Sequence, residues 1–520
     1  MGEASVSRGL VAAGHPAVCE AAAQMLAEGG NAFDAAIAAG FASSICEPAL
    51  TSLGGGGFLL ARYGDGRAVL FDFFTDTPGR ELPSRLEPHF LPVTVRFPGS
   101  EQVFNVGLGS CAVPGALRGF LHVHDRCGRL PLAEVLVPAI RLAREGVPLN
   151  PCQSYFLELL RPIMTLTEGG RALYAPSGQL LAEGERLHNP DLASFLETLP
   201  SDGDRAFYEG ELAERVASDM RDGQGLLTRA DLAAYRVIER APLEARYRGH
   251  RLLTNPPPSF GGSLLALSLG LLEQVEVRPS GPESAEHVCA LAKVMQEVEG
   301  LRQRGFASLD ALSRLPDGER HAISERVRLA TRGTTHVSVC DAEGNAASMT
   351  TSNGEGSGYV VPGAGILLNN MMGEDDLHPD GFHASPPGER VASMMSPCLL
   401  LRGDELRLAL GSGGSKRIRT ALLQVISLVV DFERPLRSAV EHPRLHWDGQ
   451  TIQLEPGLPP ASLEALSNLG PVNEWSCLDV YFGGVNAVAP DGDAAGDPRR
   501  GGAVRLAASH AVHEPDAIDS

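Results

Sequence analysis

Residues 331–370, TRGTTHVSVCDAEGNAASMTTSNGEGSGYVVPGAGILLNN, contain the pattern that decides the fold. The runs THVSVC and AASMTTS have strand character, and the turn sequence DAEGN lies between them. Together they predict an antiparallel hairpin. If the turn spans Asp341–Asn345, the register places Thr334 opposite Ser352.

The two faces of the predicted hairpin differ in polarity. Because side chains alternate along a strand, one face carries Thr334, His336 and Ser352 together with further hydroxyls. The other face carries apolar residues suited to a core, namely Val337, Val339, Ala347 and Met349. A polar face of this kind also fits an ordinary solvated sheet, so the hairpin alone does not predict a site.

The residues that follow the hairpin favour a functional site. Ser352 and Asn353 lead into a series of glycines, which allow the backbone to approach a ligand closely. The run ILLNN at Ile366–Asn370 has the signature of a buried strand ending in two amides, and an acidic cluster at 374–376 comes shortly after it. Hydroxyls, glycines, amides and carboxylates in one stretch predict a binding or catalytic site, with an exposed acidic loop as the alternative for the carboxylates.

Several motifs resemble those of the γ-glutamyltranspeptidase family. TTHVSVCDAEGNA at Thr334–Ala346, followed by ILLNN, resembles the catalytic core of that family. Three further motifs stand in the family order: GGGGF at Gly54–Phe58, PPPSFGG at Pro256–Gly262 and SMMSP at Ser393–Pro397. The members are N-terminal-nucleophile hydrolases. The resemblance therefore implies an α+β fold, a four-layer αββα sandwich of two stacked sheets between helices.

The resemblance also implies that the chain cuts itself before the first Thr of TTH. Residues 1–333 would then form a large (α) subunit, and residues 334–520 a small (β) subunit. No internal repeat or low-complexity linker separates the two parts. We therefore expect both to form one core.

Cleavage between Gly333 and Thr334 would turn Thr334 into a nucleophile with its own base. The new α-amine titrates at about pH 8, so much of it is neutral near working pH. A hydroxyl activated by an N-terminal amine needs no separate histidine. Ser352, opposite Thr334 in the predicted hairpin, is placed to hydrogen-bond the Thr334 hydroxyl.

A glycine turn supplies the other catalytic element that the resemblance implies. GSGGS at Gly411–Ser415 follows the apolar strand LRLALG and precedes a predicted helix. By similarity to the double-glycine turn of the family, the backbone amides of Gly413 and Gly414 would form an oxyanion hole. Such donors contribute roughly 3 kcal/mol each to catalysis.

The substrate-binding positions depart from the family pattern. Phe74 stands where the family has an arginine that holds the glutamate α-carboxylate, and phenylalanine cannot replace that bidentate contact. Met371 stands at the position of an amine-binding glutamine. Met394 replaces one of two carboxylate-binding serines, whereas Ser393 is retained. These changes predict a less polar acyl group than γ-glutamyl.

Two features are still compatible with a γ-glutamyl substrate. Arg80 lies six residues after Phe74 and is the candidate for a substitute arginine. Glu374 or a neighbouring carboxylate could still attract an ammonium group. The predicted substrate-binding residues are Phe74, Asn353, Glu374, Asp375, Ser393 and Met394.

Composition excludes several classes of function. The chain has 520 residues and a net charge of −20 without a basic stripe, so we expect no nucleic-acid partner. It has no apolar run long enough to cross a bilayer and no evident signal peptide, which predicts a cytoplasmic protein without a membrane partner. The nine scattered cysteines predict free thiols, and HVHD at residues 122–125 lacks a third metal ligand. We expect neither metal nor cofactor.

The sequence therefore predicts a self-processing γ-glutamyltransferase-like enzyme. It would cleave a small-molecule amide through a threonyl acyl-enzyme and pass the acyl group to water or to an amine. An amidohydrolase for a non-glutamyl amide is the first alternative, and an unprocessed binding protein is the second. By family analogy, the two processed subunits would stay together and could form a homodimer.

Other elements are predicted from local patterns. Residues 16–46 read as two Ala-rich helices, with Asn31 as the N-cap of the second helix, Ala32–Cys46. Helices are also expected at 263–273, 284–330 and 419–430, and a strand at 503–508. Residues after Ser509 are expected to form a disordered tail.

Overall fold

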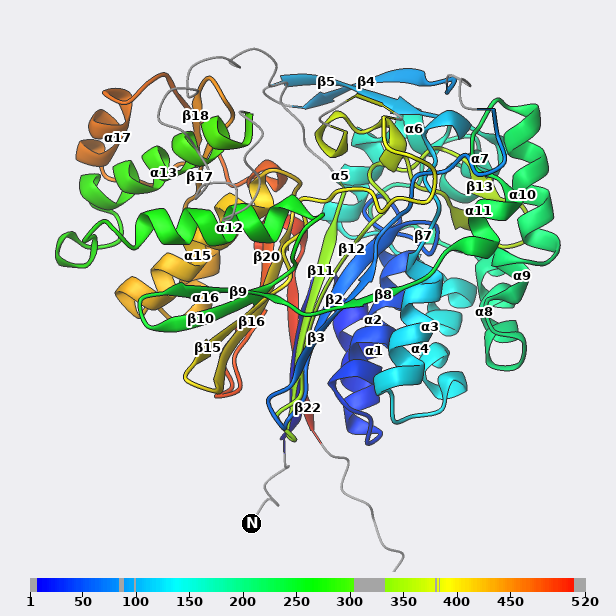
Figure 1. The fold of residues 1–520 in the computed structure, drawn as a ribbon, viewed down its shortest axis with the longest axis horizontal. Coiled ribbons are helices and arrows are strands. Elements are labelled where there is room, and N and C mark those ends of the chain that lie inside the picture. The colour runs from blue at the N-terminus through cyan, green and yellow to red at the C-terminus, as the bar shows by residue number, and fades with distance from the viewer. Residues whose placement is uncertain are drawn as a thin grey trace, which may run out of the picture.

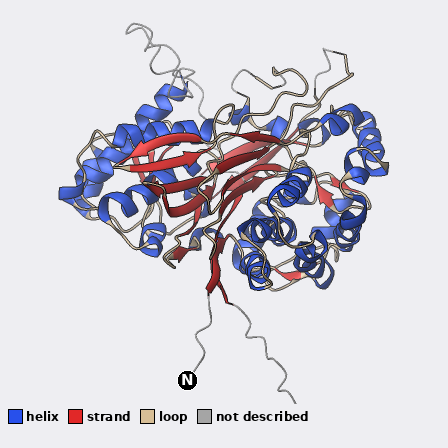
Figure 2. Cartoon of the chain, turned by 60° about the horizontal axis from the view of Figure 1, so that its bottom comes forward, coloured by secondary structure: helices blue, strands red, loops and turns tan. Residues whose placement is uncertain are grey.

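Two antiparallel sheets lie face to face in the centre of the molecule, and helices cover the outer side of each (Figures 1 and 2). The computed structural model describes residues 7–83, 88–97, 100–303, 333–378, 381–382 and 384–508. This arrangement confirms the four-layer αββα sandwich. The tail predicted after Ser509 lies outside the described residues.

The first sheet combines strands from before and after the Gly333–Thr334 bond. It has seven strands in the order β22-β1-β11-β12-β2-β3-β8. Their bounds are β22 (Ala503–Ala508), β1 (Ser7–Ala13), β11 (Thr335–Asp341), β12 (Ala346–Ser352), β2 (Gly56–Arg62), β3 (Ala68–Phe73) and β8 (Ile238–Arg240). Because β11 and β12 lie between β1 and β2, the hairpin is built into the middle of the sheet.

The second sheet also mixes both parts of the chain. It has six strands in the order β21-β20-β16-β15-β10-β9. Their bounds are β21 (Ala494–Ala495), β20 (Gly484–Val488), β16 (Glu405–Gly413), β15 (Cys398–Arg402), β10 (His250–Thr254) and β9 (Leu243–Tyr247). The expectation of one shared core fits both sheets.

The register predicted for the hairpin is confirmed. Thr335 pairs with Thr351 and His336 with Thr350. The apolar face of the hairpin belongs to the core beneath the first helical layer. The polar face is not solvated: it packs against the second sheet, where the Ser348 hydroxyl donates to the Leu410 carbonyl at 2.9 Å.

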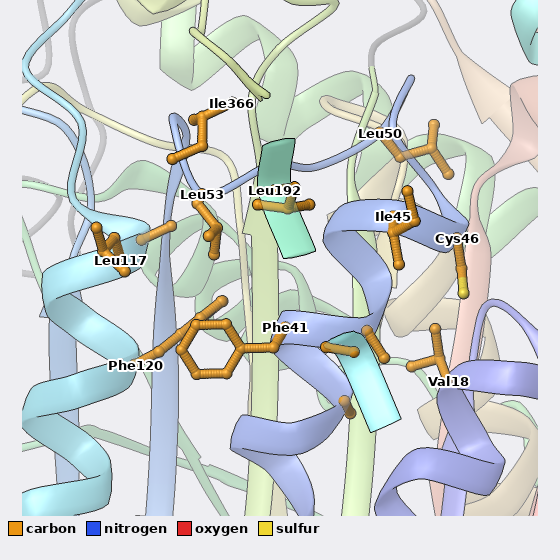
Figure 3. Packing of buried hydrophobic residues seen from close by; sticks show 14 of the residues in the cluster. Val18, Phe41, Ile45, Cys46, Leu50, Leu53, Leu117, Phe120, Leu192 and Ile366 are labelled. Carbon is orange, nitrogen blue, oxygen red and sulfur yellow. The ribbon is translucent and has the colours of Figure 1, made fainter. Parts of the chain in front are cut away.

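The first helical layer packs closely because its central helix has small residues. The layer contains α1 (Pro16–Ala27), α2 (Ala32–Cys46), α3 (Ala116–Cys127) and α4 (Leu132–Glu145). Asn31 caps α2 as predicted, and it forms a capping box with Asp34. Phe41 of α2 meets Phe120 of α3 edge-on, with ring centroids 5.2 Å apart (Figure 3).

The second helical layer covers the six-stranded sheet. It contains α12 (Phe260–Leu272), α13 (Ala285–Gln303), α15 (Arg417–Phe432) and α16 (Leu436–Glu441). The helix predicted at 263–273 begins three residues earlier, at Phe260, directly after Ser259. The helix predicted at 419–430 is longer by two residues at each end. Of the helix predicted at 284–330, the part beyond residue 303 lies outside the described residues.

Shorter elements surround the two sheets. The remaining strands are β4 (Leu91–Phe97), β5 (Ser100–Val106), β6 (Val147–Pro148), β7 (Arg186–Leu187), β13 (Val360–Val361), β14 (Ile366–Leu367), β17 (Leu445–Trp447), β18 (Ile452–Leu454) and β19 (Val472–Glu474). The remaining α-helices are α5 (Pro151–Leu159), α6 (Arg161–Met164), α7 (Glu168–Tyr174), α8 (Pro190–Asp202), α9 (Arg205–Tyr208), α10 (Glu211–Asp222), α11 (Arg229–Ala234) and α17 (Pro460–Ser467). Three-residue 3₁₀ turns that bear on the site are η3 (Met371–Gly373), η4 (Asp375–Leu377), η5 (Val480–Phe482) and η6 (Pro498–Arg500).

Three sequence expectations concern the chemistry of the chain as a whole. All nine cysteines are free thiols. In the described ranges, no helix is long and apolar enough to cross a membrane, and no cluster of three potential metal ligands occurs. The cytoplasmic location and the homodimer stay predictions.

Candidate active site

Thr334 lies directly before β11 and is buried between the sheets. Its Oγ1 donates a hydrogen bond to the carbonyl of Gly333 at 2.7 Å. The Ser352 hydroxyl donates to the same carbonyl, and its oxygen accepts the Gly354 amide at 2.9 Å. Thr334 is 4% exposed and Ser352 is 3% exposed. Two buried hydroxyls are thus directed at the carbonyl of the residue that precedes Thr334.

Gly333 is required by the close approach of two neighbouring loops. A Cβ at this position would lie 2.3 Å from the carbonyl oxygen of Gly354 and 2.6 Å from that of Ala49. Backbone atoms cannot yield as a flexible side chain does. No larger residue fits, and the carbonyl before Thr334 is therefore held in place by backbone on two sides.

The Gly413–Gly414 turn lies against the backbone of Thr334. A Cβ at Gly413 would come within 2.1 Å of the Thr334 carbonyl oxygen. Gly414 has a φ of 125°, and a Cβ there would lie 2.9 Å from Cα of Gly483. The turn predicted to form the oxyanion hole is therefore adjacent to Thr334, and both positions exclude side chains.

A pocket opens beside Thr334. It has an empty volume of about 290 Å³. The lining includes four hydroxyl residues, Thr334, Ser352, Ser393 and Ser415, and much of the rest is apolar. The lining residues are Phe74, Gly333, Thr334, Ser352, Met371, Glu374, Leu377, Ser393, Met394, Met395, Ser415 and Ile418.

Comparison with known proteins agrees with this geometry. Residues 19–507 match the family described as gamma-glutamyltranspeptidase. The chain belongs to the γ-glutamyltranspeptidase family. The resemblance stated from the motifs is confirmed, and the chain is an amide-cleaving enzyme of the hydrolase and acyltransferase type.

Relatives of two kinds resemble this family member along most of its length. The acylase ACY 1 proenzyme of Pseudomonas sp. (strain SE83) is 35% identical over 517 residues, which cover 95% of this chain and 92% of the relative. The glutathione hydrolase proenzyme of Escherichia coli (strain K12) is 30% identical over 535 residues, covering 95% and 90%. The crystal structure of cephalosporin acylase from Bacillus halodurans superposes with a TM-score of 0.80 at 25% identity, covering 97% of each chain.

The three positions that depart from the family pattern all line the pocket. Phe74 follows the end of β3, Met371 begins η3, and Met394 lies in the loop before β15. The Phe74 ring is 1% exposed and stacks on Phe58, with centroids 5.6 Å apart. These substitutions therefore change the lining of a single pocket.

Arg80 does not replace the missing arginine. It is absent from the pocket lining, and its Nε lies 3.9 Å from the carboxylate of Asp231. Its guanidinium packs so closely on Gly388 that a Cβ there would be 2.0 Å from Nη2. The guanidinium is thus engaged on a different surface from the one that Phe74 lines.

Not all of the predicted substrate-binding residues line the pocket. Glu374 does, and its Oε1 would lie 2.3 Å from a Cβ at Gly354. Ser393 also lines it. Asp375 is exposed and lies outside the pocket lining. Asn353 is completely buried, with its side-chain amide among the backbone carbonyls of Pro48, Leu50 and Gly354. Asn353 therefore supports the loop from behind.

Sequence reasoning missed several residues around Thr334. Leu377, Met395, Ser415 and Ile418 line the pocket, and Ser415 has a left-handed φ of 52°. Ser415 directly follows the double glycine, so its position was the signal available. Two further buried residues, Glu47 and Arg500, contact Thr335 and Thr334 from behind the pocket.

Proposed function

We propose that this family member is a self-processing amidohydrolase whose nucleophile is Thr334 and whose acyl pocket takes a less polar group than γ-glutamyl. The observation that carries the proposal is the pair of buried hydroxyls, of Thr334 and Ser352, directed at the Gly333 carbonyl. The word proenzyme in the names of both kinds of relative supports self-cleavage.

This geometry supplies the reacting groups for the proposed self-cleavage. Oγ1 of Thr334 attacks the carbonyl carbon of Gly333, and hydrogen bonding from Ser352 stabilises the charge on the carbonyl oxygen. The new C–O bond forms, the Gly333–Thr334 C–N bond breaks, and the hydroxyl proton ends on the Thr334 nitrogen. Water then hydrolyses the ester, which leaves a carboxylate on Gly333 and restores the Thr334 hydroxyl.

Turnover uses the same atoms on a substrate. The free α-amine of Thr334 accepts the proton of Oγ1 as the hydroxyl attacks the substrate amide. The turn at Gly413 and Gly414 stabilises the tetrahedral oxyanion. The α-amine passes that proton to the nitrogen of the substrate, whose amine then leaves, so that the acyl group is held as an ester on Oγ1 of Thr334. Water or an acceptor amine then removes the acyl group from this ester.

The wall of the pocket favours an acyl group without an α-carboxylate. A carboxylate placed against Phe74, Met371 and Met394 would lose hydration without gaining a bidentate arginine. The 35% identity to an acylase supports this choice. Glu374 in the same pocket favours a γ-glutamyl group instead, because its carboxylate can pair with an ammonium group. This is the second candidate.

Intact-mass spectrometry tests the nucleophile. We expect the wild type to give two fragments divided between Gly333 and Thr334, and Thr334→Ala to give one chain of 55.0 kDa. One uncut chain in both would overturn the proposal and favour a binding protein.

A substrate panel tests the acyl group. Anilides with γ-glutamyl, butanoyl and phenylacetyl groups share one leaving group, so differences in kcat/KM report the acyl pocket alone. We expect the two apolar anilides to react faster. A preference for the γ-glutamyl anilide would overturn the apolar assignment and support the second candidate.

A further inference from the structure

Two buried charged residues lie behind Thr334 and come from opposite ends of the chain. Glu47 directly follows α2, and Arg500 is the last residue of η6. Glu47 is 0% exposed and Arg500 is 4% exposed. Neither lines the pocket, so neither is placed to touch a substrate.

Glu47 holds the second residue of the small subunit. The Thr335 hydroxyl lies 3.0 Å from both carboxylate oxygens of Glu47 and donates to them. A Cβ at Gly14, directly after β1, would lie 2.4 Å from Oε1 of Glu47 and 2.9 Å from Oγ1 of Thr335, so the backbone at Gly14 covers this contact. Burial raises the pKa of Glu47 to about 7, and the Thr335 hydrogen bond and Arg500 act in the opposite direction.

Arg500 holds the first residue of the small subunit. Its guanidinium donates to the Thr334 carbonyl at 3.2 Å and to the Val480 carbonyl at 3.0 Å. A Cβ at Gly413 would be 3.1 Å from Nη1, and a Cβ at Gly414 would be 3.4 Å from Nη2. The guanidinium therefore lies between the nucleophile's backbone and the double-glycine turn.

We propose that Glu47 and Arg500 are positioning residues that hold Thr335 and Thr334 and set the charge around the α-amine released by self-cleavage. This inference rests on the proposed function, since the amine exists only after cleavage. Arg500 contacts the carbonyl of the residue that carries the amine. Glu47 contacts the residue next to it.

The two charges act on the amine in opposite directions. The Arg500 guanidinium disfavours a nearby ammonium group and so favours the neutral amine that accepts a proton. An ionised Glu47 favours the ammonium form. The surrounding thiols stay neutral because burial raises the pKa of each; they are Cys19, Cys46 and Cys152. Asp479 and Asp497 face Arg500, and Asp497 is itself paired with Arg444 and Arg499.

The test is the pH dependence of acylation in fully processed enzyme. The probe is 4-nitrophenyl acetate, whose small acyl group makes little demand on the pocket, and the uncut Thr334→Ala variant gives the background. The rate of the acylation burst, plotted against pH, falls at low pH as the α-amine is protonated, and this fall is the acid limb. We expect Glu47→Gln to move the acid limb to lower pH by about one unit. We expect Arg500→Met to move it to higher pH by a similar amount, and Arg500→Lys to restore it.

Further variants separate this effect from loss of folding. Asp431→Asn removes another buried carboxylate, which lies about 20 Å along α15 from the double-glycine turn, and should leave the limb unmoved. If a charge variant does not fold, Thr335→Val keeps Glu47 and Arg500 but removes the hydrogen bond that lowers the pKa of Glu47, so that a smaller fraction of this carboxylate is ionised. It should move the limb in the same direction as Glu47→Gln, by less.

Each outcome has a separate meaning. Acid limbs that coincide in processed Glu47→Gln, Thr335→Val and wild type would overturn the inference while leaving the proposed function intact. An uncut wild-type chain would instead overturn the proposed function. Opposite shifts of the acid limb in the Glu47 and Arg500 variants would support both the inference and the proposed function.

Discussion

The surroundings of Thr334 and the apolar lining of the pocket are built in different ways. Around Thr334, backbone atoms set the geometry: Gly333 and Gly413 each face a carbonyl oxygen closer than a side chain allows. In the apolar lining, the side chains of Phe74, Met371 and Met394 form the wall. A side chain can be exchanged without moving the backbone, whereas a side chain added at either glycine would displace the backbone next to Thr334. We therefore expect substitutions in the apolar lining to change substrate preference and substitutions at these glycines to abolish cleavage.

The strongest test of the backbone contacts around Thr334 is Gly413→Ala. The added methyl group would meet the Thr334 carbonyl oxygen at 2.1 Å, so we expect no detectable cleavage by intact mass. Gly270→Ala is the matched control, because a Cβ there meets nothing within 4 Å and α12 gains helix propensity. Normal cleavage of Gly413→Ala would show that these backbone contacts tolerate change as readily as the apolar wall.

A smaller effect is expected from Ser352→Ala. Loss of one hydrogen bond to the Gly333 carbonyl should slow self-cleavage about 10- to 100-fold. Ser348→Ala removes another buried hydroxyl of β12 without touching that carbonyl, and should cleave at the wild-type rate. The rate of cleavage is measured by gel electrophoresis of samples taken over time. Equal slowing in both variants would assign the effect to the strand and not to the hydrogen bond.

The side-chain-built wall should change specificity without abolishing cleavage. We expect Phe74→Arg to increase kcat/KM for the γ-glutamyl anilide relative to the butanoyl anilide by about tenfold, because a guanidinium can pair with the α-carboxylate. Phe74→Leu opens the wall without a charge and serves as the control. If Phe74→Arg remained uncut, the wall would also support the proposed nucleophile, and the contrast between the backbone contacts and the apolar wall would fail.

The smallest effect on chemistry is expected at His336, in the polar layer away from the pocket. Burial lowers the pKa of His336 to about 3 from 6.5. The unfolded chain therefore binds a proton between pH 6.5 and 3 that the folded protein does not, and stability falls by up to about 1.4 kcal/mol per pH unit as the pH is lowered through this window. His336→Gln should flatten this slope in urea titrations while cleavage at pH 7 continues. An unchanged slope would contradict the assignment.

Local patterns predicted the elements that depend on neighbouring residues. The turn DAEGN and the alternation around it were sufficient for the hairpin register, and Asn31 was sufficient for the start of α2. The motifs supplied the αββα fold and the position of Thr334 in it.

Contacts between distant segments could not be predicted in the same way. Glu47 and Thr335 are 288 residues apart, and Arg500 and Thr334 are 166 apart. An acidic residue inside the apolar run SSICEPAL was the signal available for Glu47. Asn353 follows Ser352 in the chain but turns into the loop packing, which only three-dimensional structure reveals.

The strand order has a consequence for the history of the molecule. In the seven-stranded sheet, β11 and β12 lie between β1 and β2, so strands of residues 334–520 are inserted between strands of residues 1–333. A single continuous chain can fold into this arrangement by itself. Once the bond is cut, reassembly from denaturant requires two fragments to meet and interleave, so its rate must depend on concentration. If the chain is cut as proposed, only the uncut chain carries both parts in one molecule, so we expect folding to precede cleavage.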